Sequence, residues 1–234
     1  MKDRLWTMGL VGLAIMLLAS ACRESDAGTT TTLPTTTTSS PIAEPPTTAE
    51  DAGLKWWNDR VFYEVFVRSF KDSDEDGIGD FRGLTASLDY LNDGDPSSTD
   101  DLGITGIWLM PIFPSPSYHG YDVVDYRSIN PDYGTMEDFD AFLDAAHQRG
   151  IAVIIDLVIN HTGVDHPWFQ ASRAGDPEYA DWYLWSDTDP ATTGPWGQQV
   201  WHQADGRHYF GLFWRGMPDL NLDLPAVTAK CSNP

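Results

Sequence analysis

The chain has 234 residues, of which 41% are hydrophobic and 12% are aromatic, so it can bury one sizeable domain or part of a larger one. Its 35 acidic and 14 basic residues give a formal net charge of -21, which repels phosphate backbones and anionic lipid headgroups. We therefore expect no nucleic-acid partner. Strongly acidic chains can be disordered, but those are poor in aromatic residues, unlike this one.

The N-terminus has the layout of a bacterial export signal. Lys2 and Arg4 precede an almost wholly apolar run over 5–18, and small residues lead up to Cys22. Cleavage before a cysteine resembles lipoprotein processing, so residues 1–22 are predicted to be a lipoprotein-type signal peptide whose cysteine receives lipid. An ordinary cleaved signal and an uncleaved membrane anchor are the alternatives, and the short apolar run disfavours the anchor. We expect an extracellular or cell-surface protein, attached to the bacterial membrane only through a lipid anchor.

Residues 23–54 are predicted to be a disordered linker. They are dominated by Thr and Pro and contain almost nothing apolar to bury. Such a composition favours an extended, solvated tether. The composition changes sharply at Trp56 and Trp57, so a folded region is predicted from residue 55 onward.

From residue 55 the pattern alternates between strands and helices. Three mostly apolar runs are predicted strands buried on both faces: 61–67, 104–112 and 151–159. Apolar residues at helical spacing predict a helix over about 81–92. Thr135 followed by Asp138 predicts the start of a second helix, which Gly150 is well placed to end. The order β-α-β-α-β predicts parallel strands with covering helices.

Spacing alone permits either a doubly wound sheet or a (β/α)8 barrel. No Gly-rich phosphate loop follows the first strand, which weakens the nucleotide-binding version of the fold. After residue 159 the regular pattern disappears, and a stretch of about 70 residues rich in aromatics is long for a loop. This stretch suggests a small inserted subdomain.

An acidic loop with the sequence DSDEDGIGD follows the first strand at 72–80. Aspartates at alternate positions around glycines let a tight loop aim several oxygens inward, which suits Ca²⁺. The loop is not an EF-hand, because a strand precedes it and its twelfth position is Gly83. A solvated acidic turn is the other interpretation, but aspartates packed this closely would repel one another without a cation. We therefore predict metal binding.

Two further segments carry polar residues of interest. After the second strand, aromatic rings and carboxylates alternate around Tyr121 and Asp122, which suits a sugar but is also common in structural loops. Asp156 lies among apolar neighbours in the third strand, and a buried lone carboxylate needs a partner. His161 taken alone would be a structural histidine. Polar residues clustered at the carboxyl end of a barrel strand favour a functional role, because barrel active sites lie there.

Four segments resemble signatures of the α-amylase family of glycoside hydrolases. They are the 72–80 loop, His119-Gly120-Tyr121-Asp122 with Tyr126 and Tyr133-Gly134-Thr135, the strand end at 156–161, and Met217-Pro218-Asp219-Leu220-Asn221-Leu222-Asp223. The resemblance covers residues 56–227. It implies an incomplete (β/α)8 TIM barrel, with its first three strands in 55–161 and an inserted irregular domain B in 162–227. It also implies retaining hydrolysis of α-glucosidic bonds in starch or maltodextrin.

The resemblance also implies roles for individual residues. Tyr121 would stack on the sugar at the cleavage subsite, and Asp122 and His161 would hydrogen-bond its hydroxyls. Asp156 would be a buried supporting carboxylate. The implied calcium ligands are Asp72, Asp74, Asp76, the carbonyl of Ile78, and Asp80. In some members of the family, the position of Asn160 binds a calcium shared with domain B.

The C-terminus departs from the family pattern. Retaining glycosidases need two carboxyl groups about 5–5.5 Å apart, a nucleophile and an acid/base. In this family they follow the fourth and fifth strands, and a third essential Asp follows the seventh. Residues 228–234 resemble nothing in the family, so we expect the catalytic carboxylates to lie beyond the C-terminus. A frameshift, an assembly error or a truncated gene would explain this departure. We expect this fragment to be inactive and to aggregate through its open strand edges.

The leading interpretation is an α-amylase acting outside the cell on an α-glucan or maltooligosaccharide substrate. The nearest alternatives are an α-glucosidase or oligo-1,6-glucosidase, since Gly120-Tyr121-Asp122 is similar to exo-acting members. A glucan-rearranging enzyme such as a trehalose synthase shares the same motifs. A non-catalytic, calcium-dependent glycan-binding lipoprotein is the alternative from a different class.

Overall fold

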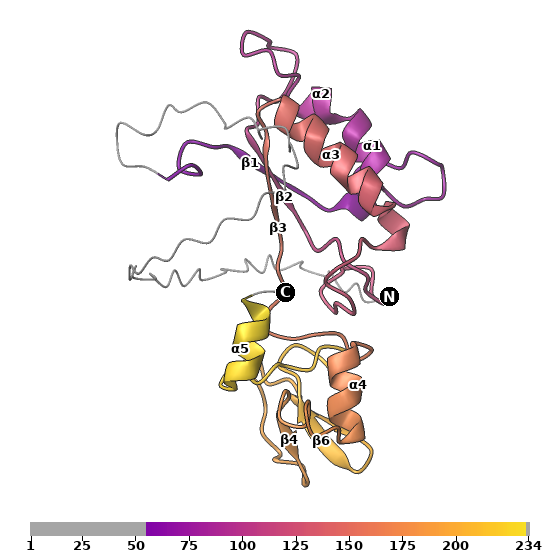
Figure 1. Cartoon of the computed structure of the whole chain (residues 1–234), viewed down its shortest axis with the longest axis vertical. Coiled ribbons are helices and arrows are strands. Elements are labelled where there is room, and N and C mark those ends of the chain that lie inside the picture. Colours follow the sequence, from indigo (N-terminus) through magenta and orange to yellow (C-terminus); the bar gives the residue numbers. More distant parts are fainter. Residues whose placement is uncertain (1–54, 233–234) are drawn as a thin grey trace, which may run out of the picture. The chain divides into compact units, whose positions relative to one another are not determined.

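The computed structural model describes residues 55–232, so the predicted signal peptide at 1–22, the predicted linker at 23–54 and the predicted lipidation site at Cys22 lie outside the described residues. In chain order the elements are β1 (Phe62–Val65), η2 (Val67–Ser69), α1 (Phe81–Ala86), α2 (Leu88–Leu91), β2 (Gly106–Leu109), η3 (Pro131–Tyr133), α3 (Met136–Gln148), β3 (Ala152–Ile155), α4 (Pro167–Ala174), β4 (Trp185–Ser186), β5 (Trp201–Ala204), β6 (Arg207–Phe210) and α5 (Pro225–Cys231) (Figure 1). No helix within 55–232 combines the length and apolar character needed to cross a membrane.

The first sheet is parallel, with the strands in the order β1-β2-β3. Val65 pairs with Leu109, and Leu109 pairs with Ile155, so the three strands are in register at their carboxyl ends. The sequential parallel order confirms the predicted β-α-β-α-β unit. It is the arrangement of consecutive strands in a TIM barrel, and it brings the segments that follow β2 and β3 to the same edge of the sheet.

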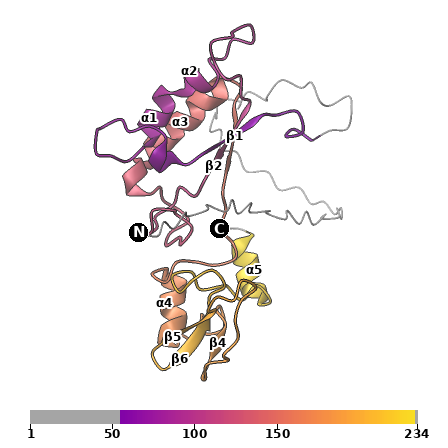
Figure 2. The ribbon, with the colours of Figure 1, turned by 180° about the vertical axis from the view of Figure 1, so that it is seen from behind.

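Helices α1, α2 and α3 all lie on one side of this sheet (Figure 2). Ile107 and Leu109 of β2 point toward the helices and are fully buried in the same core as Phe81, Leu84 and Phe142. Alternate strand residues point to the opposite face, because side chains in a strand alternate between faces.

The prediction that all three strands are buried on both faces is wrong for the described residues. Glu64 of β1 is exposed, and Trp108, its partner in register on β2, is only half-buried. Helices cover one face of the sheet, and the described residues place no second layer over the other. The apolar runs in the sequence report the hydrophobicity of the strands, which does not distinguish a covered face from an open one.

The predicted helix over 81–92 is divided into α1 and α2 at Ser87. The Ser87 hydroxyl donates to the carbonyl of Gly83 at 2.9 Å, and the Thr85 hydroxyl donates to the carbonyl of Phe81 at 2.6 Å. Hydroxyl groups that bond back to carbonyls four residues earlier compete with the helical pattern and bend it. Apolar spacing predicted the buried face correctly but not this interruption.

The second predicted helix, α3, begins and ends where its sequence indicates. Thr135 and Asp138 form a reciprocal capping box, in which each side chain accepts from the other residue's backbone N–H. Gly150, two residues after the end of the helix, has a φ of 74°, which glycine adopts without strain. A short turn at Gly150 therefore connects α3 to β3.

The second sheet is antiparallel, with the order β4-β6-β5. It packs with α4 around a separate, mainly aromatic core that includes Phe169, Trp182, Tyr183 and Tyr209. Helix α5 passes through residue 228, where the tail was predicted to begin, and Val227 within it is fully buried. The predicted boundaries at 161 and 227 stay predictions.

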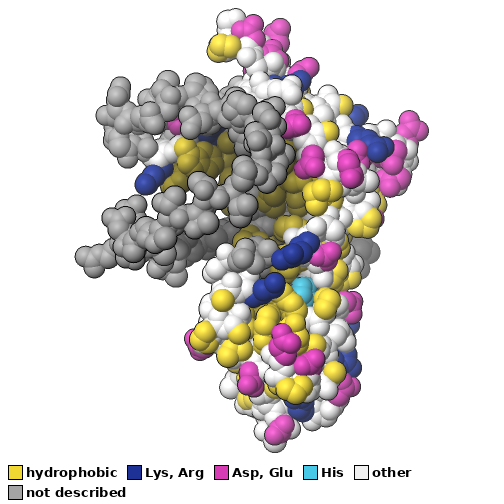
Figure 3. Space-filling model, viewed as in Figure 1, with side chains coloured by type: hydrophobic (Ala, Val, Ile, Leu, Met, Phe, Trp, Pro, Cys, Tyr) yellow, Lys and Arg dark blue, Asp and Glu magenta, His cyan; other side chains and the backbone are white. Residues whose placement is uncertain are grey.

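Acidic side chains are spread over the visible face of the molecule, with hydrophobic ones between them (Figure 3).

Candidate functional site

Asp156 follows β3 directly and has a hydrogen-bond partner at each carboxylate oxygen. The Tyr121 hydroxyl donates to Oδ2 at 2.8 Å, and the Trp108 indole Nε1–H donates to Oδ1 at 2.6 Å. Both donors come from β2 or the segment after it. Burial raises the pKa of Tyr121, and the Asp156 carboxylate acts in the same direction, so the phenol remains a donor. Asp156 is half-buried rather than buried as expected, and each of its carboxylate oxygens has a hydrogen-bond partner.

Asp122 is the most deeply buried acidic side chain of the site, with 2% of its surface exposed. Its Oδ1 accepts hydrogen bonds from the hydroxyls of Ser115 and Ser117. The Nδ1 atom of His119 lies 3.9 Å from the same oxygen. The two neutral hydroxyl donors hold the Asp122 carboxylate in place. Among the described residues, no Lys or Arg forms a salt bridge with it.

His161 is 5% exposed, and its Nε2 has no hydrogen-bond partner among the described residues. Its Nδ1 lies 3.4 Å from Nδ2 of Asn160, which can only donate, so Nδ1 accepts and Nε2 carries the hydrogen. Burial lowers the pKa of His161 to about 4, and the smaller effects of a hydrogen bond with the Tyr121 backbone and of the Asp122 charge act in the opposite direction. At neutral pH the site therefore holds a buried, neutral imidazole whose Nε2–H makes no hydrogen bond of normal geometry within the described residues, which costs free energy unless a ligand accepts it.

The segments that carry these groups lie against each other. The N–H of Gly163 donates to the carbonyl of Val123 at 2.8 Å. A Cβ added at Gly163 would lie 2.5 Å from the carbonyl oxygen of Asp122, so no side chain fits at this crossing. The structure thus brings together the four residues that the sequence singled out, which are Tyr121, Asp122, Asp156 and His161.

Residues from the irregular segment after 161 border His161. The ring of Phe213 meets the imidazole edge-on at 5.3 Å, and Trp196, 69% exposed, stacks on Phe213 at 6.5 Å. Asp219 forms an isolated antiparallel bridge with His161 through the backbone. Burial raises the pKa of Asp219, although the Leu212 N–H and the Asn160 side chain favour its charged form. The sequence signals for these contacts were the abundance of aromatics after residue 160 and, for Asp219, the segment 217–223 that resembles a family signature.

The acidic loop places three carboxylates together. Oxygens of Asp72, Asp74 and Asp80 all lie within 4.8 Å of one another. The N–H of Gly77 donates to Asp72 and, as the largest effect, lowers the pKa of that carboxyl. Burial acts to raise the pKa of Asp80, but N–H groups, chiefly that of Gly83, keep it below its usual range. A close set of ionised carboxylate oxygens fits a hard divalent cation.

Asp76 and Ile78 lie outside this group of three carboxylates. The Asp76 carboxylate instead accepts from the N–H of Ile78 at 2.7 Å, which closes a local turn. The Ile78 side chain packs against the main core. Their predicted roles as calcium ligands stay predictions.

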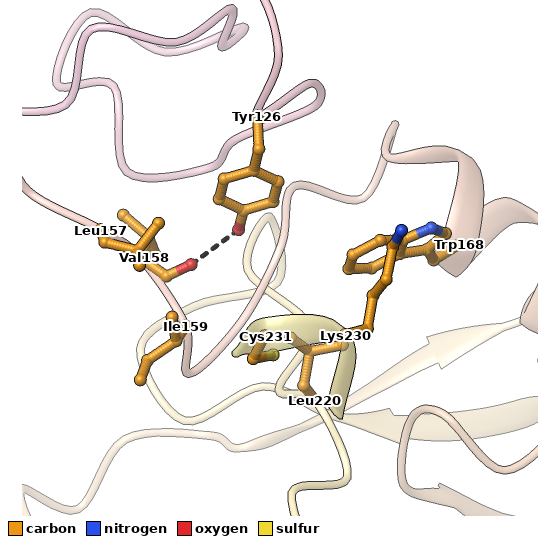
Figure 4. A pocket seen from close by; sticks show the side chains of 8 residues that line it. All are labelled: Tyr126, Leu157, Val158, Ile159, Trp168, Leu220, Lys230 and Cys231. Atoms are coloured by element: carbon orange, nitrogen blue, oxygen red, sulfur yellow. Dashed lines mark hydrogen bonds between the residues drawn. The ribbon is translucent and has the colours of Figure 1, made fainter. Parts of the chain in front are cut away.

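A small pocket is lined by other side chains (Figure 4). Its lining is mostly apolar and includes Trp168, Leu220 and Cys231, and at its side the Tyr126 hydroxyl donates to the carbonyl of Val158 at 2.8 Å. None of the four predicted sugar-site residues lines it. The pocket is therefore not the candidate site.

Comparisons with known proteins identify relatives of this chain. The family model described as "Alpha amylase, catalytic domain" matches residues 64–233. The chain is 49% identical over 173 residues to "Alpha-amylase 3" of Dictyoglomus thermophilum, covering 74% of this chain and 32% of that protein. It is 48% identical over 198 residues to "Trehalose synthase" of Pimelobacter sp., covering 80% of this chain and 32% of that protein.

A crystal structure of α-amylase from H. orenii superposes with a TM-score of 0.69 and 59% sequence identity. The match covers 74% of this chain and 36% of that one. The chain thus spans about a third of the length of the relatives that it matches.

The lowered pKa values of His161 and His166 predict a loss of stability in mild acid. Burial lowers the pKa of His166 to about 4 as well, and its Nδ1 caps α4 by accepting from the N–H of Trp168 at 3.1 Å. Between pH 6.5 and 4 the unfolded chain binds more protons, so the free energy of unfolding falls as pH falls, by up to about 1.4 kcal/mol per pH unit for each histidine.

Urea unfolding at pH 7 and pH 5 measures this loss. His166→Asn keeps an N-cap acceptor but removes the titrating group, so the variant should lose less stability on acidification than the unaltered chain. His147→Asn, at an exposed position, is the matched control and should behave like the unaltered chain. An identical pH dependence in all three proteins would contradict the assignment.

Proposed function

The chain belongs to the α-amylase family of glycoside hydrolases, and from that premise we propose that it forms the glucose-binding part of an enzyme that acts on α-glucosidic bonds of starch or maltodextrin with retention of configuration. The observation that carries the proposal is the buried, unpartnered Nε2–H of His161. It lies in a site that also holds an aromatic ring at Tyr121 and a buried carboxylate at Asp122. These three groups are complementary to the apolar face and hydroxyls of one sugar ring.

Each group has a distinct task in binding the sugar. The Tyr121 ring offers a flat apolar surface to the C–H face of glucose, and its hydroxyl is held by Asp156. The neutral His161 imidazole donates its Nε2–H to a sugar hydroxyl oxygen. The Asp122 carboxylate accepts from a sugar O–H, since an ionised carboxylate is an acceptor only.

The position of the sugar determines where the chemistry occurs. Retaining hydrolysis uses two carboxyl groups about 5–5.5 Å apart, one forming a glycosyl-enzyme bond and the other protonating the leaving oxygen. We propose that the ring held by Tyr121, Asp122 and His161 is the one whose anomeric carbon reacts. Fixing this ring is the contribution of the described residues, because positioning alone can supply a large part of a rate enhancement.

A glucan-rearranging enzyme is the second candidate, since one relative at 48% identity is named a trehalose synthase. Incubation of the protein encoded by the completed gene, which would also supply the two catalytic carboxylates, with starch, isomaltose and maltose separates the possibilities. Release of reducing sugar from starch supports an α-amylase, and cleavage of isomaltose supports an oligo-1,6-glucosidase. Conversion of maltose into a non-reducing disaccharide supports a trehalose synthase. Binding of a maltooligosaccharide without turnover of any of the three supports a glycan-binding lipoprotein.

Maltotriose binding measured by isothermal titration calorimetry tests the site directly. Asp122→Asn and His161→Gln should each weaken binding by about tenfold or more, because a hydrogen bond to a buried charged or unpartnered group is lost. His147→Gln, at an exposed position in α3, is the matched control and should bind normally. Equal affinity of all four proteins for maltotriose, or equal binding of the β-linked cellotriose, would refute the proposed site.

We propose that the acidic loop binds Ca²⁺ through Asp72, Asp74 and Asp80, and that Asp76 and the carbonyl of Ile78 complete the coordination. The close approach of three carboxylates supports this proposal. The ion would fix the turn between β1 and α1, because Asp80 also caps that helix through the N–H of Gly83.

Calcium addition and chelation give a thermal test of this loop. A Ca²⁺ concentration one hundred times the dissociation constant should stabilise the fold by about 2.7 kcal/mol, measured as a rise in Tm. Asp72→Asn combined with Asp74→Asn should abolish the rise. Asp95→Asn, in a separate exposed acidic loop, should leave it unchanged. A rise of the same size in the double variant would contradict calcium binding here.

We also propose that the protein is exported and held at the cell surface by lipid on Cys22. The basic, apolar and small residues that precede this cysteine support the proposal, as does the adjacent Thr- and Pro-rich segment. Cys22→Ser should move the protein from the membrane fraction to the soluble fraction, and mass spectrometry should detect lipid on the N-terminal cysteine of the unaltered protein. An unmodified N-terminus at another residue would point to an ordinary signal peptide.

A further inference from the structure

The indole of Trp108 holds the same carboxylate that holds Tyr121. Its Nε1–H donates to Oδ1 of Asp156 at 2.6 Å, while the Tyr121 hydroxyl donates to Oδ2 at 2.8 Å. We infer that Trp108 is a positioning residue for sugar binding, which acts through Asp156 to fix the ring of Tyr121. This inference rests on the proposed function of Tyr121 as the surface on which the sugar stacks.

The strand register places Trp108 where it can reach this carboxylate. Trp108 pairs with Ile154 of β3, and Asp156 lies two residues farther along the chain, so both side chains lie on the same face of the sheet. This is the face opposite the helix-packed Ile107 and Leu109. Trp108 is half-buried and does not belong to the main core cluster, so its hydrogen bond is its most specific contact.

A carboxylate is suited to link the two donors. Its oxygens only accept, so Asp156 can serve an indole N–H and a phenol O–H at the same time. Rotation of the carboxyl group would break both bonds together. An Asn at this position has a single oxygen and presents an N–H to one of the donors. The arrangement therefore orients the phenol of Tyr121 before a ligand arrives, which reduces the ordering cost of binding.

A second tryptophan provides a matched comparison. Trp185 donates its Nε1–H to the Ser172 hydroxyl at 2.9 Å and stacks on Phe169 in the second core. It has the same kind of indole hydrogen bond and no contact with the proposed sugar site. Trp185→Phe thus reports the general effect of removing a partly buried indole N–H.

A double-mutant cycle on maltotriose affinity tests the inference. Trp108→Phe removes the donor but keeps an aromatic ring, and it should weaken binding by about five- to tenfold, as expected for one lost hydrogen bond to a charged group. Tyr121→Phe keeps the stacking surface and should also weaken binding. If Trp108 acts through Tyr121, the double variant binds about as well as the weaker single variant. Fully additive losses, or a loss in Trp108→Phe no larger than in Trp185→Phe, would overturn the inference.

The indole N–H resonance gives a readout that does not need the sugar. In protein with ¹⁵N-labelled tryptophan, the Trp108 signal is the one missing from Trp108→Phe. It should shift in Tyr121→Phe, because the shared carboxylate loses its second donor, while the Trp185 signal stays in place. An unchanged Trp108 signal would contradict the link through Asp156.

The two experiments separate the inference from the proposed function. If the unaltered chain does not bind maltotriose but Tyr121→Phe shifts the Trp108 signal, the proposed sugar site fails while the coupling stands. Asp156→Asn covers the case in which Trp108→Phe does not fold. It retains both aromatic residues and should weaken maltotriose binding to a similar extent, and normal binding by this variant would overturn the inference.

Discussion

The site depends on how one carboxylate is accommodated at the end of an apolar strand. Asp156 follows β3, where an unpaired charge would be expensive to bury, and its two oxygens are satisfied by Tyr121 and Trp108. Those donors come from β2 and from the segment after it. The same hydrogen bonds that make the charge tolerable therefore tie two neighbouring strand ends together and orient the aromatic ring beside them. The two hydrogen bonds to Asp156 therefore contribute both to the stability of the sheet edge and to the geometry of the site.

Buried polar groups in this region divide into those that are satisfied within the chain and those that are not. The buried Asp122 and the half-buried Asp156 accept hydrogen bonds from neighbouring side chains, so they are held in fixed orientations. His161 is about as buried as Asp122, yet its Nε2 makes no hydrogen bond of normal geometry among the described residues. Folded chains rarely leave such a donor unpaired without a reason. Our proposal is that a ligand hydroxyl supplies the missing acceptor, so that the unsatisfied group marks the binding position beside the satisfied carboxylates.

Much of this arrangement could be predicted from the sequence because it depends on local patterns. The strand order, the capping box at Thr135 and the need of Asp156 for a partner all follow from residue type and spacing. The identity of that partner does not, because Trp108 reaches Asp156 only in a particular register between β2 and β3. The contact of Phe213 with His161 likewise joins residues far apart in an irregular segment. The periodicity of apolar residues describes one helix or strand at a time and contains no information on contacts between distant segments.

The central claim is that the unpartnered imidazole N–H of His161 is the point at which a glucose unit binds. The most direct measurement is the ¹⁵N NMR spectrum of the histidine ring nitrogens during a maltotriose titration at pH 7. The account predicts a neutral His161 with hydrogen on Nε2, whose signal moves on saturation with maltotriose while that of exposed His147 does not. A protonated His161 ring at pH 7, or a His161 signal unaffected by bound maltotriose, would contradict it.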